Sequence, residues 1–400
     1  MKSLMKPKSI AIIGASEEKG SVGNVLAERI KNFKGMYFYV NKKHDKILGS
    51  KSYNSILDIS SEIDLAVVAI PARFVLDVVR QCVSKKVKSM IIISAGFSEA
   101  GNSELEKEIM KIKGNMNILG PNCFGIVNNF LNLDLTFAKS NSGKSKIGFI
   151  SQSGALWSAV AEKYDVGYFI SLGNMMDIGF NEALEFMIND GNIESIVLYI
   201  ESLKEGRKFI DICKKSPKRI IVIKSGESES GKKAALSHTG SMAGNSEIYN
   251  AAFRQARVSI AKSLTEAFDK ARFGFKPGKI LIVTNAGGPG TLVADYLDGH
   301  LMKFNQKFSF GKSGNPVDVI GDATSSRFRE VFEKVKGYDT LVVIVTPQIM
   351  TDMDAIAKEV VKVKKNVVCV WMSPDGLDIL KKNNIPVFFE PKRMAEFLIF

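Results

Sequence analysis

The sequence predicts an α/β protein built from parallel β-sheets that carry helices on both faces. Short runs of β-branched residues alternate with helical patterns along the whole chain, as expected for strands that are covered on both sides. Three of these runs lead through a small-residue turn into a helical pattern: SIAIIGASEEKGSVG, KIGFISQSGALW and KILIVTNAGGPGTLVAD. With 400 residues, the chain is also too long for one ordinary core.

Each of the three junctions marks the start of a predicted domain. The stretches 129–146 and 263–279 lack strand periodicity and contain Gly, Ser, Asn or Pro, which is typical of connections. The second of them has room for a helix. The predicted domains are therefore residues 1–128, 146–262 and 278–400.

Composition excludes several classes of protein. The chain is 45% apolar and 24% charged, as in ordinary globular proteins, and no apolar run approaches the roughly 18 residues of a membrane span. Four cysteines without a C-x-x-C pair predict no zinc site or disulfide framework and a reducing, cytoplasmic location. The net charge of +13 comes from scattered lysines, so nucleic-acid binding is not predicted, and acidic small molecules or a solvated surface explain the charge.

The first junction has glycines at Gly14, Gly20 and Gly23, between a strand and a helix. Backbone N–H groups at such a turn can bind an anion. The next strand, MYFYV, leads to Lys42 and Lys43, whereas an NAD site would place an acidic residue there. Lysines suit a phosphorylated ribose, which leaves NADP or coenzyme A as candidates. The alternative is a glycine turn needed only for packing.

Later strands of this segment end in IPA (70–72), SAGF (94–97) and GPNCFG (120–125). In a parallel sheet, such carboxyl ends line one crevice. Cys123 lies among them and is a candidate nucleophile, but no histidine is near it in the sequence. A small buried thiol is the commoner role for such a cysteine.

The second junction, SQSGA at 151–155, directs the N–H groups at Ser153, Gly154 and Ala155 toward a bound anion. Further along, His238 lies among small residues in SHTG. A neutral imidazole can attack phosphorus. The Ser153 turn would cradle the phosphoryl oxygens, and Glu201, after the strand SIVLYI, would orient the other ring nitrogen. The simpler alternative is a loop histidine bonded to a backbone carbonyl.

Other motifs offer rival interpretations. The GKS segments at 143–145 and 311–313 end like Walker A motifs, but they lack the first glycine and follow no strand. More serious is the order Ser153, Glu201, His238, which is that of an α/β-hydrolase triad. Against the hydrolase, Ser151 and Ala155 replace the glycines of G-x-S-x-G.

Twelve segments spread over nearly the whole chain resemble, in this order, the α subunit of ADP-forming acetyl-CoA synthetases, which are relatives of succinyl-CoA synthetase. The segment around His238 is similar to the phosphohistidine segment of that family. The twelve segments are IAIIGASEEKGSVG, YVNKKHDKILGSKSY, VVAIPARF, IIISAGFSE, LGPNCFGI, SQSGAL, SLGNMMD, YIESLKEGRKF, KSGESESGKKAALSHTGSMAG, TNAGGPG, GNPVDVIGDAT and VTPQIMTD.

The resemblance implies a Rossmann-like CoA-binding domain followed by two flavodoxin-like domains. It implies reversible conversion of acyl-CoA, phosphate and ADP into free acid, CoA and ATP, through an acyl phosphate and a phosphohistidine. His238 would be phosphorylated, Glu201 would orient it, and residues 153–155 would bind phosphate. Coenzyme A would lie against the family's binding loops, at Gly14, Ser16, Gly20, Ser21, Gly23, Lys43, Pro71 and Asn122. Lys42 stands where the family usually has Pro and adds a charge suited to a phosphate of coenzyme A.

The resemblance also implies a partner. No segment resembles the ATP-grasp module that binds ADP or ATP with magnesium in this family, so that site is expected on a β subunit in an α2β2 assembly, and no metal is expected in this chain. The substrate would be an acyl-CoA or carboxylic acid of unspecified kind. Gly173, Asn174 and Asp177 lie in a motif shared with this family, and the sequence does not indicate what they do. A serine hydrolase and a non-catalytic CoA-binding protein stay as alternatives.

Overall fold

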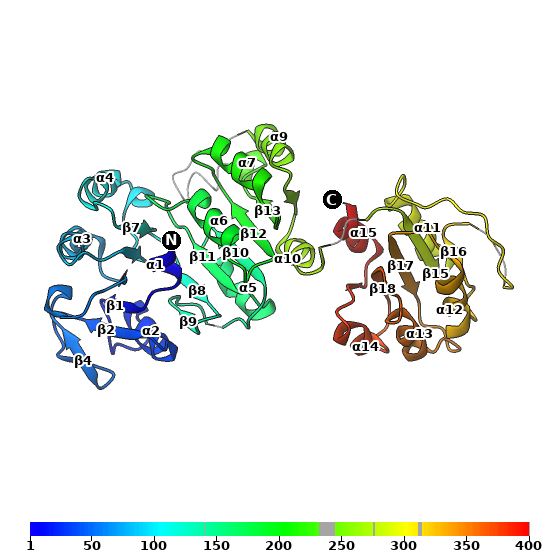
Figure 1. Cartoon of the computed structure of the whole chain (residues 1–400), viewed down its shortest axis with the longest axis horizontal. Helices are drawn as coiled ribbons and strands as arrows, with labels where there is room; N and C mark the ends of the chain where they lie inside the picture. Colours follow the sequence, from blue (N-terminus) through cyan, green and yellow to red (C-terminus); the bar gives the residue numbers. More distant parts are fainter. Residues whose placement is uncertain (140, 232–244, 275–276, 311–313, 400) are drawn as a thin grey trace. The chain divides into compact units, whose positions relative to one another are not determined.

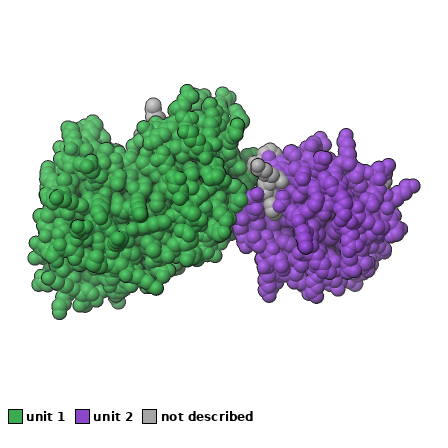
Figure 2. Space-filling model, viewed as in Figure 1, with its two compact units in different colours: residues 1–271 green, residues 272–400 purple. Residues whose placement is uncertain are grey.

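The computed structural model describes residues 1–139, 141–231, 245–274, 277–310 and 314–399. The chain divides into two compact units, residues 1–271 and 272–400 (Figure 2). Within the described residues, the first unit contains two sheets and the second unit a third (Figure 1). The predicted α/β class is confirmed, and the three domain boundaries stay predictions.

In the first sheet, the chain adds strands first on one side of β1 and then on the other. From β1 the chain adds β2 and β4 on one side, then returns to add β5, β6 and β7 on the other. Neighbouring strands are parallel, except that β3 is antiparallel to β4. In spatial order the strands are β3 (Lys46–Ile47), β4 (Ser50–Tyr53), β2 (Met36–Val40), β1 (Ser9–Ile13), β5 (Leu65–Val68), β6 (Ser89–Ile92) and β7 (Asn117–Leu119).

Alternating residues of β1 explain why both faces of this sheet are covered. Ile10 and Ile12 pack with residues of α2, whereas Ala11 and Ile13 pack with residues of α3, as the two-residue period of a strand requires. The helix α3 buries one apolar stripe through Val75, Val78, Val79 and Cys82. The helical elements here are α1 (Lys2–Met5), α2 (Val22–Arg29), α3 (Val75–Ser84), α4 (Ser103–Ile112), and the 3-10 turns η1 (Ile30–Asn32), η2 (Ile56–Asp58), η3 (Ala72–Phe74) and η4 (Ser98–Ala100).

The second sheet is mixed, which corrects the expectation of purely parallel sheets. β8 and β9 pair antiparallel at its edge, and β9 lies inside 129–146, the stretch predicted to be only a connection. Such short strands carry too few residues for a period to show. The strands in order are β14 (Ser259–Ile260), β13 (Arg219–Lys224), β12 (Ser195–Ile200), β10 (Ile147–Ser151), β11 (Tyr168–Ser171), β8 (Ile126–Asn128) and β9 (Leu133–Asp134).

The first two sheets share a core. One buried cluster runs from Ile10 of β1 to Leu198 of β12. The N-terminal segment adds a polar link, because Lys6 Nζ lies 2.5 Å from the carboxylate of Asp190, which also accepts a hydrogen bond from the hydroxyl of Tyr168 at 3.0 Å. The helices of this part are α5 (Leu156–Lys163), α6 (Phe180–Asn189), α7 (Gly206–Lys215), α9 (Ser246–Ala256) and α10 (Leu264–Phe273).

The second unit is built on a parallel sheet. Its strands in order are β16 (Val317–Asp318), β15 (Ile280–Thr284), β17 (Thr340–Val345), β18 (Asn366–Trp371) and β19 (Val387–Phe388). Its helices are α11 (Gly287–Tyr296), α12 (Ser325–Lys334), α13 (Met353–Val360), α14 (Leu377–Lys382) and α15 (Pro391–Ile399). Among the helices in the described ranges of the chain, none has the length and apolarity needed to cross a membrane.

Candidate functional site

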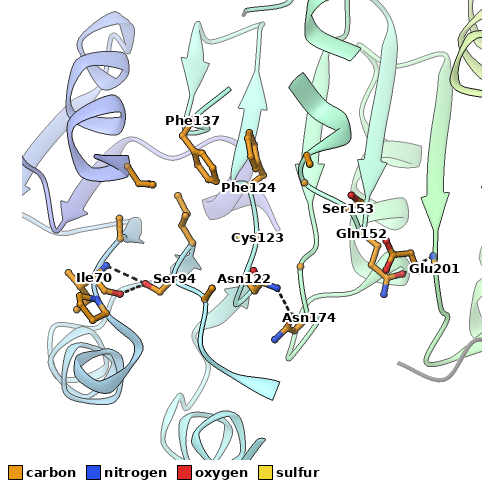
Figure 3. Close-up of a pocket in the computed structure, with 18 residues that line it drawn as sticks. Ile70, Ser94, Asn122, Cys123, Phe124, Phe137, Gln152, Ser153, Asn174 and Glu201 are labelled. Carbon is orange, nitrogen blue, oxygen red and sulfur yellow. Dashed lines mark hydrogen bonds between the residues drawn. The ribbon is translucent and has the colours of Figure 1, made fainter. Parts of the chain in front are cut away.

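A cavity of about 560 Å³ lies where the strand ends of the first two sheets meet (Figure 3). Each sheet contributes the point at which its strand order reverses. In the first sheet this point lies between β1 and β5, and in the second between β10 and β12. Ligands of open α/β sheets bind at the carboxyl ends of strands at such points. The lining includes the predicted site residues Pro71, Asn122, Ser153, Gly154, Ala155 and Glu201.

The turn between β10 and α5 presents backbone donors to this cavity. Helix α5 begins after Ala155, and no side chain caps its N-terminus. Ser151 Oγ donates to the carbonyl of Ser153 at 2.5 Å and so fixes the turn. A Cβ atom at Gly154 would lie 2.5 Å from Cβ of Phe124, so glycine lets the turn approach that side chain. In the first turn, the N–H groups of Trp157 and Ser158 donate to the carbonyls of Gly154 at 3.0 Å and Ala155 at 3.2 Å. The N–H groups just before the helix, at residues 153–155, are therefore the ones left for an anion.

Glu201 follows β12 and lines the same cavity, although only 8% of it is exposed. Gln152 connects it to the turn, because Gln152 Oε1 accepts the backbone N–H groups of Glu201 at 3.0 Å and Ser202 at 2.9 Å. Gln152 Nε2 donates to Ser202 Oγ at 3.1 Å. The sequence analysis missed Gln152, whose position beside Ser153 was its only signal. Figure 3 shows Gln152, Ser153 and Glu201 side by side.

The glycine loop between β1 and α2 borders the cavity through Val22. Gly14 has φ +91°, and a Cβ atom there would lie 2.4 Å from the carbonyl oxygen of Ala69. A Cβ atom at Gly23 would lie 2.0 Å from the carbonyl oxygen of Gly14. Ser21 Oγ accepts the backbone N–H of Asn24 at 3.2 Å and caps the helix. Packing therefore requires Gly14 and Gly23 whatever the loop binds.

The remaining predicted residues of the first sheet lie outside the lining of the cavity. Ser16 Oγ accepts the backbone N–H of Glu18 at 3.0 Å, and Gly20 has φ +84°. Lys42 and Lys43 are exposed beyond the end of β2. Asn41 ties that strand end to the glycine loop, because its Nδ2 donates to the carbonyl of Ala15 at 2.7 Å. The lysines and the loop thus share the carboxyl edge of the sheet.

Pro71 and Asn122 are placed by the loops that follow β5 and β7. Ser94 Oγ donates to the carbonyl of Ile70 at 2.5 Å, and the backbone carbonyl of Ser94 accepts the N–H of Asn122 at 2.9 Å. The adjacent Cys123 is buried, and burial raises the pKa of its thiol to about 12. A thiol with that pKa is not ionised near neutral pH, so Cys123 is not a suitable nucleophile.

Asn174 links the two sheets at the cavity, a role that the sequence analysis left open. Its Oδ1 accepts from Asn122 Nδ2 at 3.3 Å, and its Nδ2 donates to Glu99 Oε2 at 2.6 Å and Glu106 Oε1 at 2.9 Å. Asp177 accepts the backbone N–H of Ile118 at 2.8 Å. A Cβ atom at nearby Gly173 would lie 2.2 Å from the carbonyl oxygen of Pro121. These three residues hold the second sheet against the first.

Comparison with known proteins agrees with this arrangement. Residues 8–129 match the model of a CoA binding domain, and residues 144–273 match that of a succinyl-CoA ligase like flavodoxin domain. Over 97% of its length, the chain is 36% identical to acetate–CoA ligase [ADP-forming] II subunit alpha of Pyrococcus furiosus and covers 94% of that subunit. The chain belongs to the α-subunit-like ADP-forming acetyl-CoA synthetases of the succinyl-CoA ligase superfamily.

Two further relatives of the synthetase family are similar over nearly all of the chain. Over 98% of its length, this chain is 38% identical to acetate–CoA ligase [ADP-forming] I of Archaeoglobus fulgidus, but the chain spans only 62% of that protein. The dinucleotide forming acetyl-coenzyme A synthetase 1 of Ca. Korarchaeum cryptofilum, solved in complex with phosphate and ADP, superimposes with a TM-score of 0.90. The two are 30% identical, and the match covers 99% of this chain and 95% of that one.

One predicted residue of the synthetase site, His238, lies outside the described residues, as do its neighbours from 232 to 244. The described strand β13 ends at Lys224, and the described chain continues to Gly231. Of the hydrolase triad, Ser153 and Glu201 are described and both line the cavity. Ser153 does not have the positive φ of a strained residue, whereas a hydrolase nucleophile sits on a strained turn.

Proposed function

We propose that this chain is the α subunit of an NDP-forming acyl-CoA synthetase. The reaction is acyl-CoA plus phosphate plus ADP to carboxylic acid plus CoA plus ATP, and it is reversible. One observation carries the proposal: a single cavity adjoins both the loops of the CoA-binding segment and an uncapped helix N-terminus with a carboxylate beside it. The names of the relatives favour a short-chain acid such as acetate.

In the first step, the N–H groups of residues 153–155 hold phosphate, and the thioester enters past Pro71 and Asn122. A phosphate oxygen attacks the thioester carbonyl, the carbon–sulfur bond breaks, and the CoA sulfur leaves as a thiolate that takes up a proton. The product is an acyl phosphate. Fixed N–H donors are suited to this step because phosphoryl and acyl transfer depend mostly on positioning and charge stabilisation.

In the second step, the imidazole of His238 attacks phosphorus, the bond from phosphorus to the acyl oxygen breaks, and the carboxylate leaves. Glu201 would accept a hydrogen bond from the proton-bearing ring nitrogen of His238 and stabilise the charge on the ring. The terminal oxygen of ADP then attacks phosphorus, the bond from phosphorus to the ring nitrogen breaks, and ATP forms while the imidazole of His238 is regenerated. Magnesium and ADP would bind an ATP-grasp β subunit in an α2β2 assembly, and the α-subunit name of the P. furiosus relative supports the partner subunit.

The family match and the geometry favour the synthetase over both alternatives. A serine hydrolase gives no reason for a CoA-binding segment at 8–129, and Ser153 lacks the strained backbone of a nucleophile elbow. A non-catalytic CoA-binding protein gives no reason for an uncapped helix N-terminus and a buried carboxylate, Glu201, at the end of the same cavity.

The test is to label the histidine. The chain and its partner subunit are incubated with acetyl-CoA and labelled phosphate, or with terminally labelled ATP and magnesium. We expect an acid-labile, base-stable label on the wild type and its complete loss in His238→Ala. Peptide mapping locates the label. A fluorophosphonate adduct at Ser153 without any phosphohistidine would overturn the proposal in favour of a hydrolase, and CoA binding without either label would favour a binding protein.

A further inference from the structure

A buried lysine, Lys224, contacts the backbone of Glu201. Lys224 is the last residue of β13, and only 8% of it is exposed. Its Nζ donates to the backbone carbonyl of Glu201 at 2.9 Å and to that of Ser225. It also lies 4.6 Å from the centre of the Tyr249 ring, a distance at which a cation is attracted to the ring face. The strand RIIVIK, whose four middle residues are apolar, thus ends in an ammonium group at the carboxyl edge of the sheet.

Lys224 completes a clamp on the backbone of Glu201. Gln152, which follows β10, accepts the N–H of Glu201 at 3.0 Å. Lys224, at the end of β13, donates to its carbonyl at 2.9 Å. These two strands flank β12, the strand that leads to Glu201. The backbone of Glu201 is therefore fixed from both neighbouring strands.

Lys224 also changes the electrostatics of the cavity. Glu201 brings negative charge to the place proposed for a phosphate anion, and like charges at short range repel each other. A positive charge directly behind Glu201 offsets that repulsion. Burial lowers the pKa of Lys224, and the carboxylates of Glu227 and Glu201 oppose the shift. The cation that offsets the charge of Glu201 is therefore part of the sheet itself.

We propose that Lys224 is a positioning residue for phosphoryl transfer: it fixes Glu201 through its carbonyl and supplies the positive charge that lets phosphate bind beside that carboxylate. The carbonyl of Ser225, its second partner, begins the segment that leads along the sequence to His238. Lys224 does not line the cavity, so it acts through Glu201. This inference rests on the proposed function.

The opposite end of the same strand offers a matched control. Lys218 comes immediately before β13, and its Nζ donates to the backbone carbonyls of Met187 at 2.8 Å and Asp190. Burial lowers its pKa as well. Lys218 thus makes the same kind of bonds as Lys224, to two carbonyls, but at the amino end of the strand. A role confined to holding carbonyl groups predicts similar consequences for the two lysines.

The experiment compares Lys224→Met, Lys224→Arg and Lys218→Met in the full chain with its partner subunit. With acetyl-CoA and inorganic phosphate, we expect Lys224→Met to raise the KM for phosphate and to slow phosphohistidine formation, each by about 10-fold or more, as is typical when a group that stabilises charge in an active site is removed. The KM for acetyl-CoA should stay nearly constant. Lys224→Arg should recover most of the loss, and Lys218→Met should lower only the Tm.

The inference is overturned if Lys224→Met and Lys218→Met lower the Tm by the same amount and have the same KM for phosphate and the same rate of phosphohistidine formation. It is also overturned if Lys224→Arg is as impaired as Lys224→Met. Should Lys224→Met not fold, Lys224→Gln takes its place, because the amide still donates to carbonyls but carries no charge. A wild type that forms no phosphohistidine overturns the proposed function, and this inference with it. A phosphorylated wild type with unimpaired Lys224 variants overturns this inference alone.

Discussion

Two strand–turn–helix junctions of the first unit differ in how their helices begin. At the junction of β1 and α2, Ser21 caps the helix by accepting the N–H of Asn24 at 3.2 Å, and Gly14 and Gly20 have positive φ. At the junction of β10 and α5, no side chain caps the helix. The second junction lines the cavity with four consecutive residues, 152–155, whereas the first reaches it through Val22.

The comparison shows that glycine content alone does not identify the junction most open to an anion. The glycines of the first loop are explained largely by backbone packing, because Gly23 sits where a Cβ atom would lie 2.0 Å from a carbonyl oxygen. The serine turn has fewer glycines, but no side chain caps its helix N-terminus. An unsatisfied helix N-terminus is the feature that calls for an anionic ligand.

The largest expected effects come from adding one methyl group to each junction. Gly23→Ala forces a Cβ atom against the rigid carbonyl of Gly14, and we expect a loss of about 3 kcal/mol of unfolding free energy. This outweighs the gain of about 1 kcal/mol that alanine gives a helix. Gly154→Ala places its Cβ atom 2.5 Å from Cβ of Phe124, and a loss of about 2 kcal/mol is expected. Denaturant unfolding measures both losses.

The variants Gly23→Ala and Gly154→Ala should also differ in which substrate they bind less well. We expect Gly23→Ala to raise the KM for CoA and Gly154→Ala to raise the KM for phosphate, each with little change in the other constant. Gly191→Ala is the control, because a Cβ atom there has no neighbour within 4 Å. Equal effects of both variants on both substrates would show that the junctions do not have separate roles.

A smaller effect is expected from the serines. Ser21→Ala removes the acceptor of the Asn24 N–H, which should lower the unfolding free energy by about 1 kcal/mol, the usual value of a helix cap. Ser153→Ala removes no cap and should leave stability unchanged. Thermal unfolding of the two variants beside the wild type measures the difference. A matching loss of stability in Ser153→Ala would show that α5 is capped after all.

Much of the fold follows from local pattern. Buried runs such as SIAII and TLVVIV predict central parallel strands, and a helix does occupy residues 264–273, in the second predicted connection. β8 and β9 were not predicted, because three-residue and two-residue strands are specified by their partners in the sheet and not by a period. Strand order is likewise a tertiary property.

The sequence predicted the residues that line the cavity, but not the residues that hold them in place. Ser153, Glu201, Pro71 and Asn122 follow strands, and the carboxyl edge brings them to one cavity. Gln152, Asn174 and Lys224 act through hydrogen bonds to backbone or side chains more than 20 residues away, which no local pattern encodes. The sequence signal for Lys224 is a lysine that directly follows a run of apolar residues in a strand.

The most direct test of the central claim, that thioester and phosphate meet in this cavity, uses His238→Ala. The variant, with its partner subunit, is given acetyl-CoA, inorganic phosphate and hydroxylamine, and released CoA and acetyl hydroxamate are measured. Because the first step needs the turn at 153–155 but not the imidazole, we expect phosphate-dependent release of CoA with matching hydroxamate. Absence of CoA release, or release that does not depend on phosphate, would contradict the claim.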